Sequence, residues 1–351
     1  MTHQAVGIFQ HIHGYVYTRA LISACNMKVF DILAFGKQTA EEISQVMETD
    51  FSATQDLLNM LVLMGYVQKG VQEDSASPND GYTNSELSCK YLTSSSPYSL
   101  IPVVELTDQM IFQLARYLTS AIREGKSQVE RTFGESVFLS EMLVIDREKC
   151  EGFIMAMHSF RKVFVCDPAQ QLFELNSHRL ACDFGGGTGV IAYSLADTYP
   201  SMQFVVYDLP AVVEVVEKFR NQGSMRTKSS VCFQGGDPLR DPLPRVDLFI
   251  LSNTVNIWPG DLFANVLNRI FEALQPGGAV LILEPVPGDE KPTQIHSLMF
   301  SLVSLISVGS KCRSFEEYRE LLDKHGFVNI MLKRSASLCD AIMATKPITN
   351  T

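Results

Sequence analysis

Hydrophobic and polar positions follow two different patterns along the chain. Over residues 5–34, apolar residues recur at intervals of three and four, which is the period of an amphipathic helix. In the second half, apolar runs of strand length alternate with helix-like segments. These runs are residues 178–184, 202–209, 246–253 and 279–286. Apolar strands separated by helices predict a doubly wound α/β domain with a parallel sheet, whose ligand lies at the carboxyl ends of the strands.

Residues 39–85 show the pattern of a winged helix-turn-helix. In a capping box, each of two side chains satisfies the other residue's free backbone N–H at a helix start. Two pairs fit this pattern: Thr39 with Glu42, and Ser52 with Gln55. A hairpin-like segment with a turn at Asp80-Gly81 follows these two short predicted helices. This order of elements predicts the winged helix-turn-helix.

Charge argues against a nucleic-acid partner for this motif. Residues 51–64, the second predicted helix, contain Asp56 and neither lysine nor arginine. Donors for phosphates and base edges are therefore missing from it. The net charge of the chain is −10 and its pI is near 5.2, the wrong sign for binding a polyanion. We expect no nucleic-acid partner, and we interpret the apolar helix as a packing surface for dimerisation.

The chain is long enough for two ordinary domains. We expect a helical winged-helix dimerisation domain at residues 1–100 and a helical connector lining the substrate pocket at residues 101–175. A Rossmann-like nucleotide-binding domain is expected at residues 176–351. The most apolar stretch, residues 295–309, is too short and too rich in serine to span a membrane, so we expect a buried helix there.

Composition indicates a cytoplasmic protein without a metal. The eight cysteines are scattered singly and show no metal-ligand spacing, which is typical of reduced thiols. His11 and His13 have no acidic or cysteine ligand close by, so we expect no metal site there. The amino terminus lacks a basic region followed by an apolar run, and we expect no secretory signal and no membrane association.

A glycine-rich loop follows the first strand of the α/β domain. Asp183, Gly185, Gly187 and Gly189 form the pattern D-x-G-x-G-x-G at the start of a predicted helix. Such glycines allow a tight turn and a close approach of the backbone to a ligand. The dinucleotide fingerprint requires a further glycine where Val190 stands. The loop therefore favours S-adenosylmethionine (SAM) over NAD without excluding NAD.

Carboxylates follow the next two strands. Asp208, with Leu209 after it, ends the second strand about 20 residues beyond the loop, the separation expected of a carboxylate that binds ribose hydroxyls. Asp237, with Pro238 after it, follows the third strand and is expected to accept a hydrogen bond from an adenine amino group. Three such elements after three successive strands predict a nucleotide site.

From about Thr18 to Lys346 the chain resembles the class I SAM-dependent small-molecule O-methyltransferases, and within them the acetylserotonin O-methyltransferase group. The matching segments occur in the family's order: DFGGGTG, YDLP, GDPLRDPLP, LQPGGAVLILEPV and LLDKHGF…DAIMATK. The resemblance implies SAM as cofactor, a small-molecule substrate and an intertwined homodimer. In that dimer the helical half lends residues to the partner's pocket.

The resemblance also exposes a departure at the catalytic base. Relatives carry a histidine after the fourth strand, and a glutamate on a later loop holds its ring. This chain has Asn256 at the histidine position and Val308 or Gly309 at the glutamate position. An arginine or lysine that contacts the methionine carboxylate in relatives corresponds here to Asn253. Because an amide has no useful pKa near neutrality, Asn256 cannot be a general base.

Three hypotheses remain open. In the first, the chain methylates an acidic, enolic hydroxyl that needs no base, and Asn256 donates a hydrogen bond to the oxyanion. In the second, NAD-dependent oxidation of a cyclitol ketone generates that hydroxyl, as in the bifunctional methyltransferase-oxidoreductases that form gadusol, which the chain resembles. In the third, the chain is a dimeric scaffold or ligand sensor without catalysis.

Other residues are candidates for a replacement base or for substrate contacts. His158 and His296 are the two histidines that would lie near the substrate by resemblance, although packing roles are open for both. Arg161, together with Lys162, would replace the lost cation near a carboxylate, bind an anionic substrate or lie in solvent. The expected substrate-binding residues are Met157, Arg161, Trp258, Met299 and Phe300.

Overall fold

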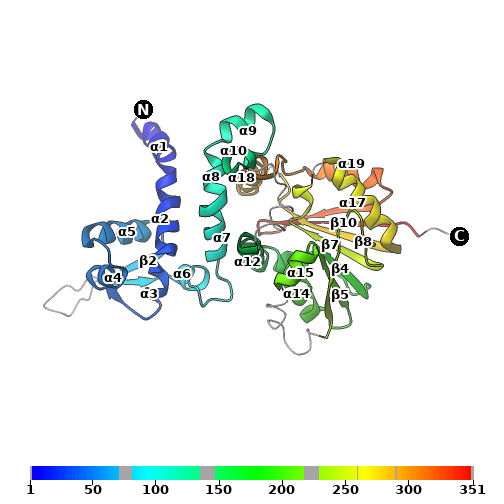
Figure 1. The fold of residues 1–351 in the computed structure, drawn as a ribbon, viewed down its shortest axis with the longest axis horizontal. Coiled ribbons are helices and arrows are strands. Elements are labelled where there is room, and N and C mark those ends of the chain that lie inside the picture. Colours follow the sequence, from blue (N-terminus) through cyan, green and yellow to red (C-terminus); the bar gives the residue numbers. More distant parts are fainter. Residues whose placement is uncertain are drawn as a thin grey trace. The chain divides into compact units, whose positions relative to one another are not determined.

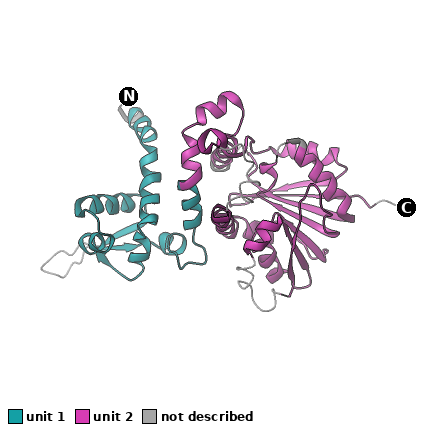
Figure 2. Ribbon diagram, in the orientation of Figure 1, with its two compact units in different colours: residues 1–108 teal, residues 109–351 magenta. Residues whose placement is uncertain are grey.

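The computed structural model divides the chain into two compact units, residues 1–108 and 109–351 (Figure 2). The residues expected to form a connector, 101–175, are therefore divided between the two units. The structure describes residues 2–70, 81–134, 147–216, 229–258, 260–288 and 291–348.

The first unit is mainly helical and carries a small antiparallel sheet (Figure 1). Its helices are α1 (Thr2–Ile12), α2 (Gly14–Asn26), α3 (Val29–Leu33), α4 (Ala40–Met47), α5 (Phe51–Leu63), α6 (Glu86–Tyr91) and α7 (Ile101–Leu106). Its strands are β1 (Gln38–Thr39), β2 (Val67–Gly70) and β3 (Gly81–Asn84), paired in the order β1-β3-β2. Helices α4 and α5 followed by the β2–β3 pair have the element order predicted for a winged helix-turn-helix.

One of the two predicted capping boxes is present. Glu42 N–H donates to the Thr39 hydroxyl over 3.2 Å, and Thr39 N–H donates to the Glu42 carboxylate over 2.7 Å. The second predicted box is wrong, because α5 begins at Phe51 and Ser52 lies inside it. Asp50 caps this helix instead, its carboxylate accepting from Ala53 N–H over 2.9 Å.

The predicted hairpin turn at Asp80-Gly81 falls partly outside the described residues, since the description resumes at Gly81. Leu58 and Leu61 of α5 are fully buried in the core of the first unit, so these apolar side chains pack within the chain itself. The use of this helix as a dimerisation surface stays a prediction.

The second unit is built on a seven-stranded sheet in the order β6-β5-β4-β7-β8-β10-β9. The strands are β4 (Leu180–Phe184), β5 (Gln203–Asp208), β6 (Val231–Gly235), β7 (Val246–Ser252), β8 (Leu274–Glu284), β9 (Val328–Lys333) and β10 (Asp340–Thr345). Strands β4 to β8 pair in parallel as predicted, whereas β10 runs antiparallel to both β8 and β9. The sheet is thus mixed.

Helices cover both faces of this sheet (Figure 1). The helices from the boundary between the units onward are η1 (Thr107–Ile111, π-helical), α8 (Phe112–Ala115), α9 (Leu118–Glu124), α10 (Val129–Phe133), α12 (Arg147–Phe164), α13 (Cys166–Gln171), α14 (Val190–Thr198), α15 (Pro210–Val216), η3 (Val255–Ile257, 3₁₀), α17 (Gly260–Ala273), α18 (Lys291–Val308) and α19 (Phe315–Lys324). Helices α8, α9 and α10 pack against α18 rather than against the sheet. Helix α14 packs against β5 and β6, while α17 packs against β8 and α19 against β9. The chain order reverses between β4 and β7, and ligands of such sheets bind at this reversal.

Helix α18 is not the buried helix that its apolar sequence predicts. Four of its residues, one or two turns apart, are exposed: Ile295 (56%), Leu298 (55%), Met299 (60%) and Leu302 (43%). Apolar content alone does not distinguish a core helix from one that presents an apolar stripe at its surface.

All eight cysteines are free thiols. In the part of the chain that the structure describes, no helix combines the length and the hydropathy that a bilayer crossing requires. Within the same residues, no three histidine, cysteine or carboxylate side chains are grouped closely enough to bind a metal ion.

Candidate active site

A cavity of about 590 Å³ lies in the second unit at the carboxyl ends of β4, β5, β6 and β7. Helix α12 contributes part of its wall. The residues that line it are Phe153, Ile154, Met157, His158, Arg161, Phe184, Gly185, Gly187, Thr188, Tyr207, Asp208, Leu209, Val212, Asp237, Pro238, Leu239, Arg240, Asn253, Thr254, Ile257 and Trp258. The wall is largely apolar with a few polar groups, which is typical of a small-molecule site.

Two glycines of the loop after β4 line this cavity in a backbone conformation that favours glycine. Gly185 and Gly187 have φ angles of +66° and +55°. A Cβ atom at Gly185 would lie 2.6 Å from the Thr254 methyl carbon. Gly189, at φ +73°, is the N-cap of α14 and lies outside the cavity wall among the described residues. The loop thus brings its backbone into the cavity at two of the three predicted positions.

Asp208 is held at the cavity wall by two backbone amides. Its carboxylate accepts from Gly187 N–H and from Leu209 N–H, both over 2.8 Å. Burial raises the pKa of Asp208, and these two hydrogen bonds oppose the rise. An ionised carboxylate has about four acceptor positions, so about two remain for the hydroxyls of a ligand.

Asp237 and Pro238 line the cavity beyond β6. Asp237 Oδ1 accepts from Leu239 N–H over 2.8 Å, and Oδ2 lies 3.5 Å from Arg240 Nε. Strands β6, β5, β4 and β7 are neighbours, so Asp237, Asp208, the glycine loop and Asn253 follow one another along one edge of the sheet. This order matches an elongated nucleotide lying across the strand ends.

Asp183 was predicted to bind the cofactor, but the structure places it beneath the loop. The residue is 1% exposed and is not among the described residues that line the cavity. A Cβ at Gly186 would lie 2.7 Å from Asp183 Cγ, so the carboxyl group fills the space under the turn. Burial raises the pKa of Asp183 to about 6, against the attraction of Arg161. A ligand in the cavity would therefore not touch this carboxyl group.

His158 is the only imidazole among the described residues of the cavity wall. Its Nδ1 is hydrogen-bonded to the Thr188 hydroxyl at 2.8 Å. Burial, with the nearby Lys162 and Arg161 cations, lowers the pKa of His158 to about 4. The ring is therefore neutral at pH 7 and is a weak base.

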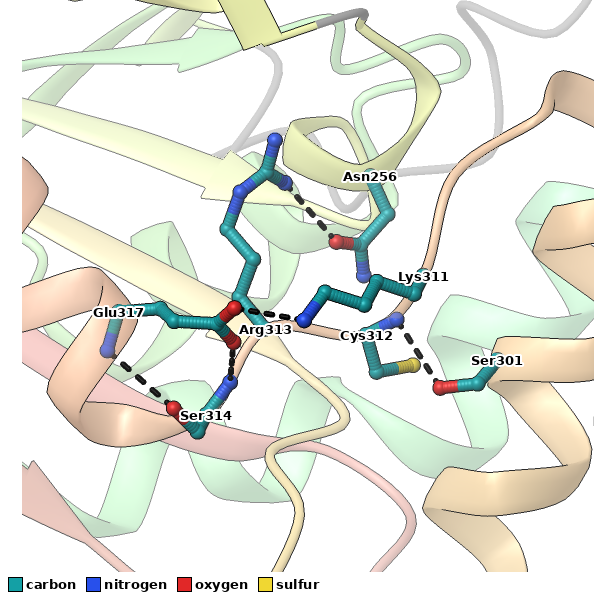
Figure 3. A network of polar contacts seen from close by, with 7 residues as sticks. All are labelled: Asn256, Ser301, Lys311, Cys312, Arg313, Ser314 and Glu317. Atoms are coloured by element: carbon teal, nitrogen blue, oxygen red, sulfur yellow. Dashed lines mark hydrogen bonds and ion pairs between the residues drawn. The ribbon is translucent and has the colours of Figure 1, made fainter. Parts of the chain in front are cut away.

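Asn256 is buried and is not among the described lining residues. Its Nδ2 donates to Glu284 Oε2 over 3.0 Å, and its Oδ1 accepts from Arg313 Nη1 over 3.2 Å. Figure 3 shows Arg313 directed at the Asn256 carbonyl. Burial raises the pKa of Glu284 to about 7, although Val255 N–H and Arg313 favour its ionised form. One N–H and the carbonyl of the Asn256 amide are thus used inside the protein, and the residue does not belong to the described cavity wall. The role of this amide as a donor to the substrate stays a prediction.

The loop after α18 leaves little space for a side chain at Gly309. Gly309 has φ +71°, and a Cβ there would lie 3.0 Å from Ser127 N. Ser127 is fixed in place because its hydroxyl donates to the Ser307 carbonyl over 2.8 Å. Beyond Gly309, Lys311 pairs with Glu317 over 2.6 Å, and Glu317 forms a capping box with Ser314 (Figure 3). A glutamate at position 309 would be both strained and crowded.

Comparisons with known proteins identify the family. Residues 115–328 match the family model of the O-methyltransferase domain, and residues 9–94 match that of the O-methyltransferase dimerisation domain. The first match alone covers more than half of the chain. The chain belongs to the O-methyltransferase family.

Three relatives show how far the similarity extends. A human protein described as a probable bifunctional dTTP/UTP pyrophosphatase/methyltransferase is 33% identical over 342 residues, covering 97% of this chain and 53% of that protein. The chain thus spans about half the length of this relative. The Gallus gallus acetylserotonin O-methyltransferase is 29% identical over 97% of this chain and 96% of its own length. The crystal structure of human N-acetylserotonin methyltransferase in complex with SAM has a TM-score of 0.90, 26% identity and 98% coverage of both chains. The resemblance stated from the sequence motifs is confirmed.

Three residues expected near the substrate lie elsewhere. His296 and Met299 are exposed on α18, and neither belongs to the described cavity wall. Phe300 packs edge-on against Phe160, with ring centroids 5.7 Å apart. His296 and Met299 thus lie on the exposed side of α18, and Phe300 is used for packing against α12. The expected residues Met157, Arg161 and Trp258 do line the cavity.

Sequence reasoning missed several residues of the site. Phe153 and Thr188 line the cavity, and Glu284 and Arg313 hold Asn256. Phe153 lies four residues before Met157 on α12, so helical spacing could have found it. No local signal links Glu284 or Arg313 to Asn256, because these contacts join distant segments.

Proposed function

We propose that the chain is a SAM-dependent O-methyltransferase acting on a small molecule whose hydroxyl is acidic enough to ionise near neutral pH. The observation that carries this proposal is the engagement of Asn256 by Glu284 and Arg313. Neither this amide nor a side chain at Gly309 offers a base. The enolic hydroxyl of a cyclic diketone, which is a vinylogous carboxylic acid, has the required acidity.

Charge supports SAM as the nucleotide. The described carboxylates at the cavity are Asp208 and Asp237 in the wall and Asp183 beneath the loop. Bound SAM would supply a methyl group on a positively charged sulfur, which these carboxylates favour. Asp208 would accept from the ribose hydroxyls and Asp237 from the adenine amino group. The relative solved with SAM has the same overall fold.

The glycine loop itself argues against the pyrophosphate of NAD, because Val190 stands where the dinucleotide fingerprint requires a further glycine. Conversion of a cyclitol ketone to gadusol would be favoured only if NAD bound as well as S-adenosylhomocysteine. A scaffold without catalysis would be favoured only if neither nucleotide bound.

The wall of the cavity suits a hydroxyl that arrives ionised. General-base catalysis typically contributes ~10²–10⁴-fold to a rate, and this term is unnecessary for an oxyanion. His158 is too weak a base to deprotonate a phenol, whose pKa is about 10. The His158 imidazole can accept a proton efficiently only from a donor whose pKa is close to its own. Met157 and Trp258 would hold the acceptor ring against the methyl donor, so orientation provides the acceleration.

We further propose that the protein is a homodimer. The match to the dimerisation domain supports this assignment. The exposed apolar residues of α18, and Ile8, Phe9 and Ile12 of α1, are the surfaces that association would cover. Light scattering on the purified chain would give a mass of two copies, and a monomer at micromolar concentration would contradict this part of the proposal.

Binding and turnover test the proposal separately. Calorimetric titration with S-adenosylhomocysteine is expected to show binding, and a parallel titration with NAD none. Binding of both nucleotides would favour the bifunctional enzyme, and binding of neither the scaffold.

Acceptor acidity is then varied. Cyclic enols and phenols of similar size, with hydroxyl pKa values from about 4 to about 10, are assayed with SAM at fixed pH. Methyl transfer is expected only to acceptors that are substantially ionised at the pH of the assay. Equal rates for a phenol and an enol would contradict the proposed substrate class.

A further inference from the structure

One cation lies buried in the wall of the cavity with hydrogen-bond donors to spare. Arg161, on α12, is 5% exposed. Its Nη2 donates to the Ser252 carbonyl at the end of β7 over 2.7 Å, whereas its buried Nε has no hydrogen-bond partner. Its Nη1 lies 3.6 Å from the position that a Cβ of Gly187 would occupy. A guanidinium has five donor hydrogens, and most of these are unused here.

No described carboxylate lies within ion-pair distance of this guanidinium. Arg161 interacts electrostatically with the more distant carboxylates of Asp183, Asp208 and Glu284. The described contacts contain no ion pair of Arg161. Leaving a buried charged donor unsatisfied costs free energy, so such a group at a cavity wall indicates a ligand. The natural partner of a guanidinium fork is a carboxylate.

The order of groups along the sheet edge shows which part of a ligand reaches Arg161. Asp237 and Asp208 mark the base and sugar positions beyond β6 and β5, and Gly185–Gly187 follow beyond β4. A nucleoside whose base and sugar lie beyond β6 and β5 would place its sulfur substituents beyond β4 and β7. Arg161 lies at this position and donates a hydrogen bond to the Ser252 carbonyl. The other cation of the described wall, Arg240, lies at the opposite end beside Asp237.

The structure assigns to Arg161 the binding of the amino-acid carboxylate of the methyl donor: we propose that its Nη1 donors, beside the Gly187 turn, form charge-assisted hydrogen bonds with this carboxylate. This inference rests on the proposed use of SAM. Of the roles that the sequence left open for Arg161, it selects replacement of the lost cation near a carboxylate over substrate binding. The neighbouring Asn253 is uncharged, and its amide donates to the Cys339 sulfur over 3.5 Å, so it does not supply the cation. A charge-assisted pair of this kind is worth about 10- to 100-fold in affinity.

The test compares two ligands that differ only in the carboxylate: S-adenosylhomocysteine and its decarboxylated analogue. Calorimetry on the full chain is expected to show that Arg161→Gln weakens the first ligand about 10- to 100-fold and leaves the second within about 3-fold. Equal losses for both ligands would mean a structural role and would overturn the inference. Arg161→Lys keeps a cation without the planar fork, and we expect a smaller loss with the same ligand selectivity. This variant decides the question if the glutamine variant does not fold.

Two controls separate this inference from the proposed function. Asp208→Asn should weaken both ligands, because both carry the ribose that Asp208 is proposed to bind. If the unaltered protein bound neither ligand, the proposed use of SAM would fail. If it bound both with equal affinity and Arg161→Gln changed neither, only the role of Arg161 would fail. An Arg161 that served the substrate would instead raise the KM of the acceptor and leave the affinity for S-adenosylhomocysteine unchanged.

Discussion

The amide nitrogen of Asn256 donates to Glu284 Oε2 over 3.0 Å, linking the turn after β7 to the end of β8. Arg313 closes the arrangement from the other side through the Asn256 carbonyl. Asparagine suits this place because it offers a donor to a carboxylate and an acceptor to a guanidinium at once. The residue at the expected base position has therefore become part of the framework.

Asn256→His is expected not to raise turnover of the true substrate. The imidazole would enter a buried site between Glu284 and Arg313, and the lost hydrogen bonds would lower the free energy of unfolding by about 1–3 kcal/mol. Steady-state kcat and chemical denaturation measure the two effects. A rise in kcat of tenfold or more would refute the argument from acceptor acidity.

Gly309→Ala is expected to destabilise the protein more than Gly125→Ala. Both glycines have positive φ, +71° and +63°, so both variants bear the backbone strain of about 1–2 kcal/mol. Only at Gly309 would the new Cβ meet a neighbour, Ser127 N at 3.0 Å; at Gly125 nothing lies within 4 Å. Urea unfolding of the two variants measures the difference in their free energies of unfolding, which is the cost of the close contact with Ser127. Equal losses of stability would show that the backbone at Ser127 moves away at no cost.

Asp208→Asn is expected to weaken S-adenosylhomocysteine about 10- to 100-fold, because a charged acceptor for the ribose hydroxyls is lost. Isothermal calorimetry measures the affinity. Asp197→Asn, on the exposed end of α14, removes the same charge away from the cavity and is expected to bind as the unaltered protein does. Unchanged affinity in the Asp208 variant would place the nucleotide elsewhere.

The stability of the protein relative to Glu284→Gln is expected to fall between about pH 4.5 and pH 7. Burial raises the pKa of Glu284 to about 7 from its ordinary value of 4.5, so the folded protein binds more protons than the unfolded chain in this window. The free energy of unfolding then decreases with rising pH, by on the order of 1–3 kcal/mol, and levels off above pH 7. Denaturation of both proteins at several pH values measures the difference, and an increase over this window would contradict the raised pKa.

His158→Gln is expected to lower kcat less than tenfold on an acidic acceptor. A required general base would cost ~10²–10⁴-fold, whereas an ionised acceptor needs none. Thr188→Val, which removes only the partner of His158 Nδ1, is the matched control and should change kcat by a similar small factor. A loss above 100-fold in the His158 variant would make this residue the base.

Short sequence motifs predicted the residues on the nucleotide side of the cavity. The contacts of Asn256 and the orientation of α18 depend on residues far apart in the chain, so no motif shows them. The glycine spacing and the aspartates after β5 and β6 depend on short segments, so the sequence shows them. The N-cap of α5 was assigned to Ser52 because two capping candidates lie two residues apart; the extended backbone of Asp50, φ −64° and ψ 132°, decides between them. The Asn256–Arg313 contact joins residues far apart in the chain, and the exposure of Met299 depends on how α18 is rotated.

The close approach of the Gly309 backbone to Ser127 also limits how a base could be engineered into this site. A histidine at position 256 would have no paired acid on the loop after α18, and an acidic side chain at position 309 would require the segment around Ser127 to move. We expect each single replacement to lower the stability of the protein with no gain in rate. A histidine–glutamate pair therefore needs several coordinated substitutions in two segments that are far apart in the chain.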